Sequence, residues 1–216
     1  MGRIAAALKT AGYVTLAPNY RWRSHSLGQM VAALTPVLAA FEARLNGPLH
    51  FVTHSLGGLV ARGLITASRP ARLGRVVMLG PPNAGSELAD LAFRLHLHRL
   101  ILGPVGAHLR TVRSREDENL LGPVDFDLGV IAGSRPLDPL LWRLALSRPN
   151  DGKVTIAATR IAGMADHIVL PVSHILMTSD PGVIAQIGAF LGNGRFLRPQ
   201  LTPPRATAAA GRTGSR

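Results

Sequence analysis

A serine at position 55 is the first candidate for chemistry, because it separates an apolar run from a helical pattern. Residues 49–52 predict a short buried strand, and apolar residues then recur at the spacing of one helix face: Leu59, Val60, Leu64 and Ile65. A serine on a tight strand-to-helix turn has its hydroxyl raised clear of the backbone, and the positive end of the helix favours negative charge there. Ser55 is therefore either a nucleophile or an ordinary helix cap, since serine is also a common cap residue.

The residues around this serine form the pattern Thr53-x-Ser55-x-Gly57. It differs from the usual Gly-x-Ser-x-Gly only at its first position, where Thr53 is still small. Gly57 is predicted to remove a side chain that would collide with the strand, and Gly58 to let helix and strand pack closely. A similar string at residues 24–28 has no apolar strand before it and is interpreted as unrelated to the site.

Two downstream residues could activate the serine. A serine hydroxyl needs a base to take its proton, and the base needs a carboxylate to hold its tautomer. Asp151 and His174 follow Ser55 in that chain order, and each lies in a predicted loop. Asp166 and Asp180 are alternative acids, but Asp166 precedes a predicted strand and Asp180 is explained as a helix cap.

Other residues near these candidates have simpler structural explanations. Asp151 lies in an Asn-Asp-Gly sequence, so it is either the acid or a plain turn residue. His54 adjoins Ser55 but should project away from it on an alternating strand, which favours a structural role. His96 and His98 would point to different faces of a helix, which argues against a metal pair.

Strands that alternate with helices predict an α/β fold with a mostly parallel sheet flanked by helices. Further strands are predicted at residues 13–17, 75–79, 128–132 and 168–171, and further helices at residues 4–10, 27–45 and 181–192. We expect Ser26 and Asp180 to cap the last two helices, Pro36 to kink the second, and Gly192 to end the third. A turn at residues 149–154 leads into residues 154–158, and residues 136–147 include a short apolar segment.

The segment after residue 79 is the predicted substrate side of the fold. Residues 80–86 form a loop at the end of a strand, where ligands bind in open α/β sheets, so Asn83 and Ser86 are predicted to line the pocket. Residues 87–122 form an insertion with several apolar residues on one helical face: Leu88, Leu91, Ala92 and Leu95. This helix is either a lid over an acyl-chain pocket or part of the core.

Four segments together resemble a bacterial α/β-hydrolase of the lipase and esterase type: Thr-His-Ser-Leu-Gly-Gly at 53–58, Gly-Pro-Pro-Asn-Ala-Gly-Ser at 80–86, Asn-Asp-Gly-Lys-Val at 150–154 and Leu-Pro-Val-Ser-His at 170–174. The resemblance covers about residues 3–197. It implies that Ser55 is the nucleophile, Asp151 the acid, His174 the base and the N–H of Leu56 an oxyanion donor. It further implies carboxylic ester hydrolysis without metal or organic cofactor. A thioesterase, a lipid acyl-hydrolase and a non-catalytic hydrolase-fold binding protein are the alternatives.

The resemblance also implies a segment upstream of residue 1. In the family, the helix that matches residues 3–10 follows a strand and a His-Gly loop that supplies a second oxyanion N–H, and neither is in this sequence. We therefore expect an N-terminally incomplete chain that keeps only the Leu56 donor and has weak activity. Unpaired edges at residues 13–17 and 49–52 would also favour aggregation.

Composition narrows the remaining classes of function. The 216 residues, with 47% hydrophobic content and a mean hydropathy of +0.21, suit one domain at residues 1–198, followed by a basic tail at 199–216 that we expect to be disordered. The absence of cysteine excludes disulfides and thiolate metal sites.

The formal net charge is +12, but the arginines are scattered and match no recognition motif, so we expect no specific nucleic-acid binding. No apolar run reaches the ~18 residues of a membrane span. We expect a cytoplasmic protein whose partner is a small-molecule or lipid ester, with peripheral membrane contact left open.

Overall fold

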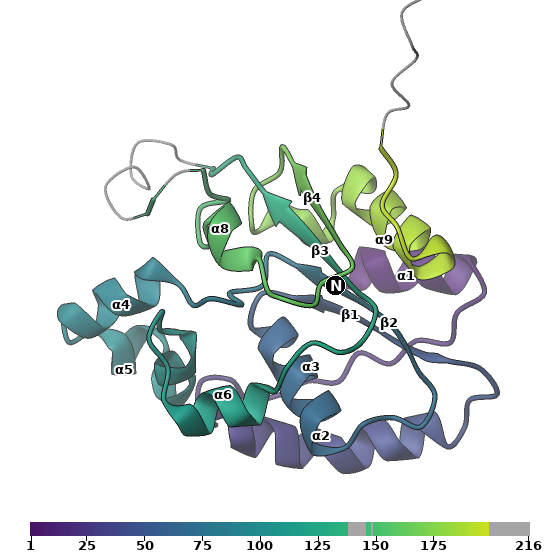
Figure 1. Cartoon of the computed structure of the whole chain (residues 1–216), viewed down its shortest axis with the longest axis horizontal. Helices are drawn as coiled ribbons and strands as arrows, with labels where there is room; N and C mark the ends of the chain where they lie inside the picture. Colours follow the sequence, from purple (N-terminus) through teal and green to yellow (C-terminus); the bar gives the residue numbers. More distant parts are fainter. Residues whose placement is uncertain (138–145, 148, 199–216) are drawn as a thin grey trace, which may run out of the picture.

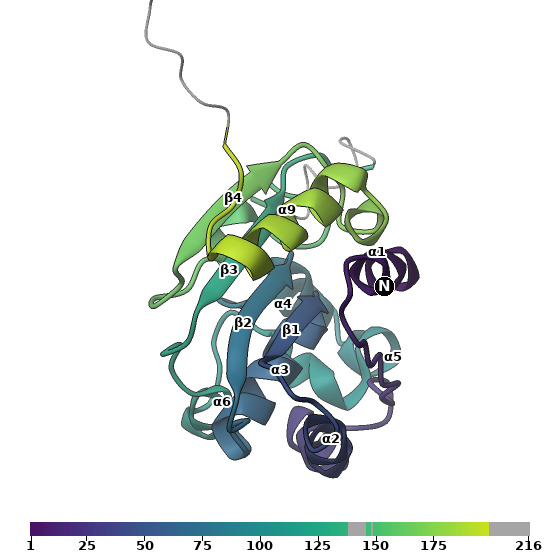
Figure 2. The same ribbon diagram turned by 90° about the vertical axis from the view of Figure 1, so that its right-hand side faces the viewer.

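Four parallel strands form the centre of the computed structural model, which describes residues 1–137, 146, 147 and 149–198. They lie in the order β1-β2-β3-β4 and comprise β1 (Leu49–His54), β2 (Leu73–Leu79), β3 (Leu128–Gly133) and β4 (Asp166–Leu170). Helices cover both faces of this sheet (Figures 1 and 2). The predicted α/β class is therefore confirmed. Most of the apolar segment expected within residues 136–147, and the tail at 199–216, lie outside the described residues.

The helical segments follow the predicted order, with several short additions. They are α1 (Gly2–Thr10), α2 (Leu27–Glu42), α3 (Leu56–Ala67), α4 (Glu87–Arg94), α5 (His98–Ile101), the 3-10 helix η1 (Gly103–Leu109), α6 (Arg115–Leu121), α8 (Ile156–Thr159), the 3-10 helix η2 (Leu176–Thr178) and α9 (Pro181–Asn193). Residues 87–122 thus form four short helical segments around one side of the sheet (Figure 1). The turn at residues 149–154 leads into the short helix α8.

The prediction of a strand at residues 13–17 is wrong. These residues are not assigned to any strand, and the ladder of β1 pairs it with β2 alone among the described residues. A strand persists only where a neighbour accepts and donates its backbone hydrogen bonds, and local β propensity cannot replace that neighbour. The segment instead runs without regular structure from α1 to α2, beside the β1 edge of the sheet (Figure 2).

Alternation along the central strands explains how the two faces are covered. Val77 and Leu79 of β2 belong to a core cluster with Ile4 of α1 and Phe190 of α9. Val76 and Met78 on the opposite face belong to a cluster with Ile65 of α3. Because successive side chains of a strand point to opposite faces, one apolar run can serve both layers. The sheet is consequently buried between α1 and α9 on one side and α3 on the other.

A third cluster attaches the outer helices to α3. It joins residues of α2, α3, η1 and α6: Leu27, Met30, Val31, Leu34, Leu59, Val60, Leu64, Val105 and Leu121. Ser26 begins α2 with a capping box, in which its side chain accepts from Gln29 N and the Gln29 side chain accepts from Ser26 N. Asp180 caps α9 by accepting from Val183 N at 2.9 Å. Both predicted caps are confirmed.

The C-terminal end of α9 differs from the prediction. The helix continues past Gly192 to Asn193 and ends at Gly194, which has φ +71°. Glycine adopts this left-handed conformation without a Cβ clash. Gly194 therefore ends the helix, and Gly192 remains within it. Among the described residues, no helix is long and apolar enough to cross a membrane.

Parallel pairing determines where a site can form. The carboxyl ends of all four strands meet at one edge of the sheet, so the residues that follow each strand are brought together there. Ser55 follows β1, residues 80–86 follow β2, and His174 follows β4 by four residues. Residues far apart in the chain are thereby gathered at one edge.

Candidate active site

Ser55 lies in a strained turn between β1 and α3. Its backbone has φ +55° and ψ −126°, and it is one of two non-glycine residues with positive φ among those described. Such a conformation costs about 1–3 kcal/mol and persists only where the surrounding structure imposes it. Here Ser55 N donates to Leu79 O at 2.8 Å, which extends the sheet ladder into the turn. Its side chain makes no hydrogen bond that caps α3, so the helix-cap explanation of Ser55 is not supported.

The two glycines after the turn have unequal roles. A Cβ on Gly58 would lie 3.1 Å from Pro81 Cβ and 3.2 Å from Met78 Sδ, so its absence allows α3 to approach β2 closely. At Gly57 a Cβ would meet only Tyr20 Oη at 3.4 Å and Thr53 Cβ at 3.6 Å, which are ordinary contacts. The predicted role of Gly58 is therefore confirmed, and the predicted collision at Gly57 is wrong.

Asp151 and His174 form a buried hydrogen-bonded pair. His174 Nδ1 lies 2.7 Å from Asp151 Oδ2, and the two residues are 3% and 1% exposed. Because a carboxylate only accepts, Nδ1 carries the proton and Nε2 is left with a lone pair. The backbone adds a second connection, since His174 N donates to Asp151 O at 2.9 Å. This is the arrangement in which a histidine can act as a base.

The carboxylate of Asp151 also holds its own turn. Its Oδ1 accepts from Lys153 N at 2.9 Å and from Val154 N at 2.8 Å, while Oδ2 faces His174. The sequence left open whether Asp151 is a turn residue or the partner of a histidine. The structure shows both contacts, because Oδ1 accepts within the turn and Oδ2 accepts from His174. A Cβ on Gly80 would lie 3.0 Å from Asp151 Oδ2 and from His174 Nδ1, so a larger residue there would crowd the pair, and the φ of +51° also favours glycine.

His54 lies against His174, contrary to the sequence prediction that it projects away from the site. Its Nε2 is 3.0 Å from the backbone oxygen of His174, and the ring centroids are 4.6 Å apart at 44°. Strand alternation fails as a guide here because the chain leaves the extended conformation at Ser55. Burial, followed by the charge of His174, lowers the pKa of His54 to about 4.

A large apolar cavity adjoins Ser55. Its volume is about 1070 Å³, and Ser55, Leu56 and Ser86 are among its lining residues. Leu88, Leu91 and Leu95 of the 87–122 insertion line it as well, together with residues of α2 and the whole of β1. As the first residue of α3, Leu56 has an N–H without an intrahelical acceptor. Ser86 thus lies in the wall of this cavity, and its contact with a substrate stays a prediction.

Sequence reasoning missed two groups in the wall of this cavity. Residues 16–20 and Trp22 line it although they belong to no helix or strand. The hydroxyl of Tyr20 lies 3.4 Å from the place that a Cβ of Gly57 would occupy, and burial raises its pKa. No periodic pattern marks an irregular segment, so only the folded chain places it beside β1.

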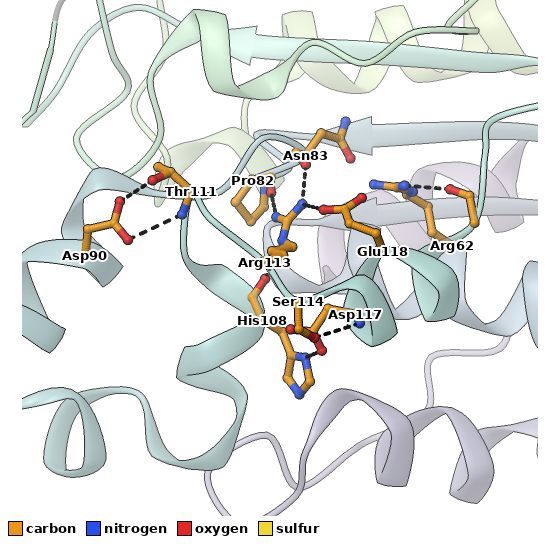
Figure 3. A network of polar contacts seen from close by, with 11 residues as sticks. Arg62, Pro82, Asn83, Asp90, His108, Thr111, Arg113, Ser114, Asp117 and Glu118 are labelled. Atoms are coloured by element: carbon orange, nitrogen blue, oxygen red, sulfur yellow. Dashed lines mark hydrogen bonds and ion pairs between the residues drawn. The ribbon is translucent and has the colours of Figure 1, made fainter.

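Asn83 does not line the cavity, contrary to the prediction. It is 4% exposed, and its Nδ2 donates to Thr159 O at 2.9 Å, which fastens the 80–86 loop to α8. On the other side of the loop, Arg113 donates to Asn83 O at 2.6 Å, to Pro82 O at 2.7 Å and to His108 O at 2.8 Å (Figure 3). Asn83 is thus a structural residue of the loop.

The other sequence candidates lie away from this constellation. Asp166 pairs with Arg198 and accepts from Phe196 N, and the hydrogen bond from Arg198 is the main cause that lowers the pKa of its carboxyl. Asp180 is occupied as a cap. His96 lies between α4 and α5 with positive φ, and His98 stacks on Phe93. Among the described residues, no group of His, Asp and Glu could hold a metal ion.

Comparisons with known proteins identify the fold through structure alone. No family model matches the sequence, and no curated protein matches it. The mature Bacillus licheniformis lipase BlEst2 superposes with a TM-score of 0.65 at 20% identity, covering 88% of this chain and 82% of that one. The metagenomic carboxyl esterase MGS0156 superposes with a TM-score of 0.63 at 19% identity, covering 81% of this chain and 58% of that one. Phospholipase PlaB from Legionella pneumophila, in complex with thio-NAD, superposes with a TM-score of 0.62 at 19% identity, covering 85% of this chain and 53% of that one.

These likenesses agree with the parallel sheet flanked by helices. The chain therefore has the α/β-hydrolase fold, which it shares with the solved structures of these lipases and esterases.

Proposed function

We propose that this chain is a serine hydrolase that cleaves carboxylic esters with apolar acyl groups, through an acyl-enzyme on Ser55. The observation that carries the proposal is the buried hydrogen bond between Asp151 and His174 at the sheet edge where Ser55 stands in a strained turn. The similarity in fold to lipases and esterases supports the same class of reaction.

Each step assigns a task to one side chain. His174 Nε2 takes the proton of Ser55 as Oγ attacks the ester carbonyl, and Asp151 stabilises the resulting imidazolium. The N–H of Leu56 donates to the oxyanion. His174 then gives its proton to the leaving alcohol, and a water activated by the same histidine hydrolyses the acyl-enzyme. The hydrogen bonds of the described residues include none between Ser55 and His174, and such contacts commonly tighten only when substrate is bound.

The cavity supports an apolar acyl group. Its walls are mostly apolar, and it extends from Ser55 along β1 to Leu49. Six residues of a strand span about 20 Å, so a long acyl chain has room beside β1. The fold similarity to phospholipase PlaB favours a lipid acyl ester as the second candidate substrate, and a thioester would use the same residues.

The test is a series of p-nitrophenyl esters of increasing acyl length, assayed with the parent and with Ser55→Ala, His174→Ala and the double variant. Each single substitution should remove nearly all turnover, and the double variant should lose little more, because the residues act as one unit. Ser68→Ala, at the exposed C-terminal end of α3, is the matched serine control and should retain parental turnover.

A fluorophosphonate probe should label the parent at Ser55 and should not label Ser55→Ala. If purified Ser55→Ala hydrolyses the esters like its parent, Ser55 is not the nucleophile. An unlabelled, inactive parent would instead support a non-catalytic hydrolase-fold binding protein.

A further inference from the structure

His54 contacts His174 both through a ring nitrogen and through its ring face. Its Nε2 meets the backbone oxygen of His174 at 3.0 Å, and its ring packs on the His174 ring at 4.6 Å between centroids. A carbonyl oxygen only accepts, so Nε2 of His54 carries the proton and donates. The tautomer of His54 follows from this contact.

The backbone of His174 is thereby fixed at both of its polar groups. Its N–H donates to Asp151 O at 2.9 Å, and its carbonyl accepts from His54. With both groups bonded, the Cα–Cβ direction of His174 is set by β1 and by the Asp151 turn together.

The charge state of His54 suits this place. The charged or titratable groups that act on it are His174, Asp151 and the α-amino group of Met1, and burial is the largest influence. The pKa of about 4 leaves the ring neutral at neutral pH. A neutral ring face beside His174 does not oppose a proton on that imidazole, whereas a second imidazolium would.

We propose that His54 is a positioning residue for His174: it holds the backbone and ring plane of the base so that Nε2 faces Ser55. This role rests on the proposed hydrolase function. It differs from the structural role expected of a strand residue, because its effect passes through one catalytic side chain and not through the stability of the sheet.

Two substitutions separate the hydrogen bond from the ring. His54→Phe keeps an aromatic ring against His174 but removes the N–H, while His54→Gln keeps an N–H donor and removes the ring. For His54→Phe we expect kcat on a soluble ester to fall about tenfold with KM within about twofold, as for the loss of one hydrogen bond in the transition state. His54→Gln should recover part of that loss.

The matched control is His167→Phe. His167 is also a partly buried histidine on the sheet, its pKa is likewise about 4, and its Nε2 bonds Thr159 Oγ1 at 3.0 Å, but it lies away from the cavity wall. Its substitution should lower the melting temperature while leaving kcat near that of the parent. Equal kcat for His54→Phe and His167→Phe at matched folded fraction would overturn the proposal.

A readout without turnover keeps the test separate from the proposed function. The proton between His174 Nδ1 and Asp151 should give a low-field NMR signal in the parent, and His54→Phe should broaden or shift it, while His167→Phe should not. An unchanged signal in His54→Phe overturns the positioning role even if the parent hydrolyses no ester. If the signal changes in His54→Phe and the parent hydrolyses no ester, the positioning role is retained and the hydrolase function is rejected.

Discussion

At the scale of residues, the site depends on side chains that each satisfy more than one partner. Asp151 divides its two oxygens between the turn at Lys153 and Val154 and the ring of His174. Ser55 combines a sheet hydrogen bond with a left-handed backbone. Such over-determined positions tolerate few substitutions, because one change removes several interactions at once.

Asp151→Asn should preserve the fold but reduce kcat by up to ~10⁴, because the amide favours the wrong tautomer of His174. An asparagine can still accept from Lys153 N and Val154 N through its side-chain oxygen, so circular dichroism and the melting temperature should stay near those of the parent.

Asp166→Asn is the matched control for the acid. Its carboxyl bonds Arg198 and Phe196 N at the other end of β4, so we expect lower stability with little change in kcat. Kinetics that reverse the order of the two variants would show that Asp151 is not the acid.

At the scale of elements, the 80–86 loop is held by the insertion that follows it. The Arg113 side chain is 3% exposed and donates to three backbone oxygens, two of them in this loop (Figure 3). Glu118 of α6 is its nearest carboxylate, at 3.6 Å. Through Arg113 the short helices η1 and α6 support a loop beside the site.

Arg113→Lys should destabilise the protein by about 2–4 kcal/mol, since a single ammonium group cannot reach all three oxygens and leaves buried acceptors unpaired. Chemical denaturation measures the loss. The control is Arg115→Lys, at the exposed first turn of α6, which should change the free energy of unfolding by less than about 0.5 kcal/mol. Similar losses for both would mean that the carbonyl contacts of Arg113 contribute little.

The lid expected at residues 87–122 stays a prediction. Leu91 of α4 lines the cavity, so Leu91→Ser should reduce activity on long-chain or emulsified esters more than on an acetate ester. Leu100→Ser on α5 is the control, because Leu100 is 86% exposed and lies outside the cavity wall. Equal losses on both esters, with a lowered melting temperature, would place Leu91 in the core.

At the scale of the whole molecule, partly buried neutral histidines make stability depend on pH. Burial is the main cause that lowers the pKa of both His54 and His167 to about 4, compared with about 6.5 in an unfolded chain. Between these values the unfolded chain binds protons that the folded chain does not. Stability is therefore fully present above about pH 6.5 and falls as the pH is lowered toward 4.

We expect the melting temperature to drop between pH 7 and pH 4.5, and the drop to be smaller in His167→Gln. His96→Gln, at an exposed position between α4 and α5, should retain the parental drop. Thermal unfolding at several pH values, followed by circular dichroism, measures both. An identical pH dependence in parent and His167→Gln would exclude His167 as a source of the effect.

The sequence by itself determined most of the fold and named Asp151 and His174, which the structure places in one hydrogen-bonded pair. Apolar periodicity located β1, β2, β3, α2 and α9 because these elements bury a regular face, and local signals located the caps Ser26 and Asp180. Asp151 was preferred to Asp166 as the candidate acid because Asp151 lies in a predicted loop, whereas Asp166 precedes a predicted strand.

Only the tertiary structure decided the contacts that depend on neighbours distant in sequence. Residues 13–17 have strand-like composition but no partner, so they form no strand. Asn83 has the position of a pocket residue, yet Thr159 and Arg113 hold it in the loop. His54 contacts His174 because the loop after β4 brings His174 to the carboxyl end of β1. Local patterns encode helices, strands and caps, whereas the environment of a side chain is created by the segments that fold against it.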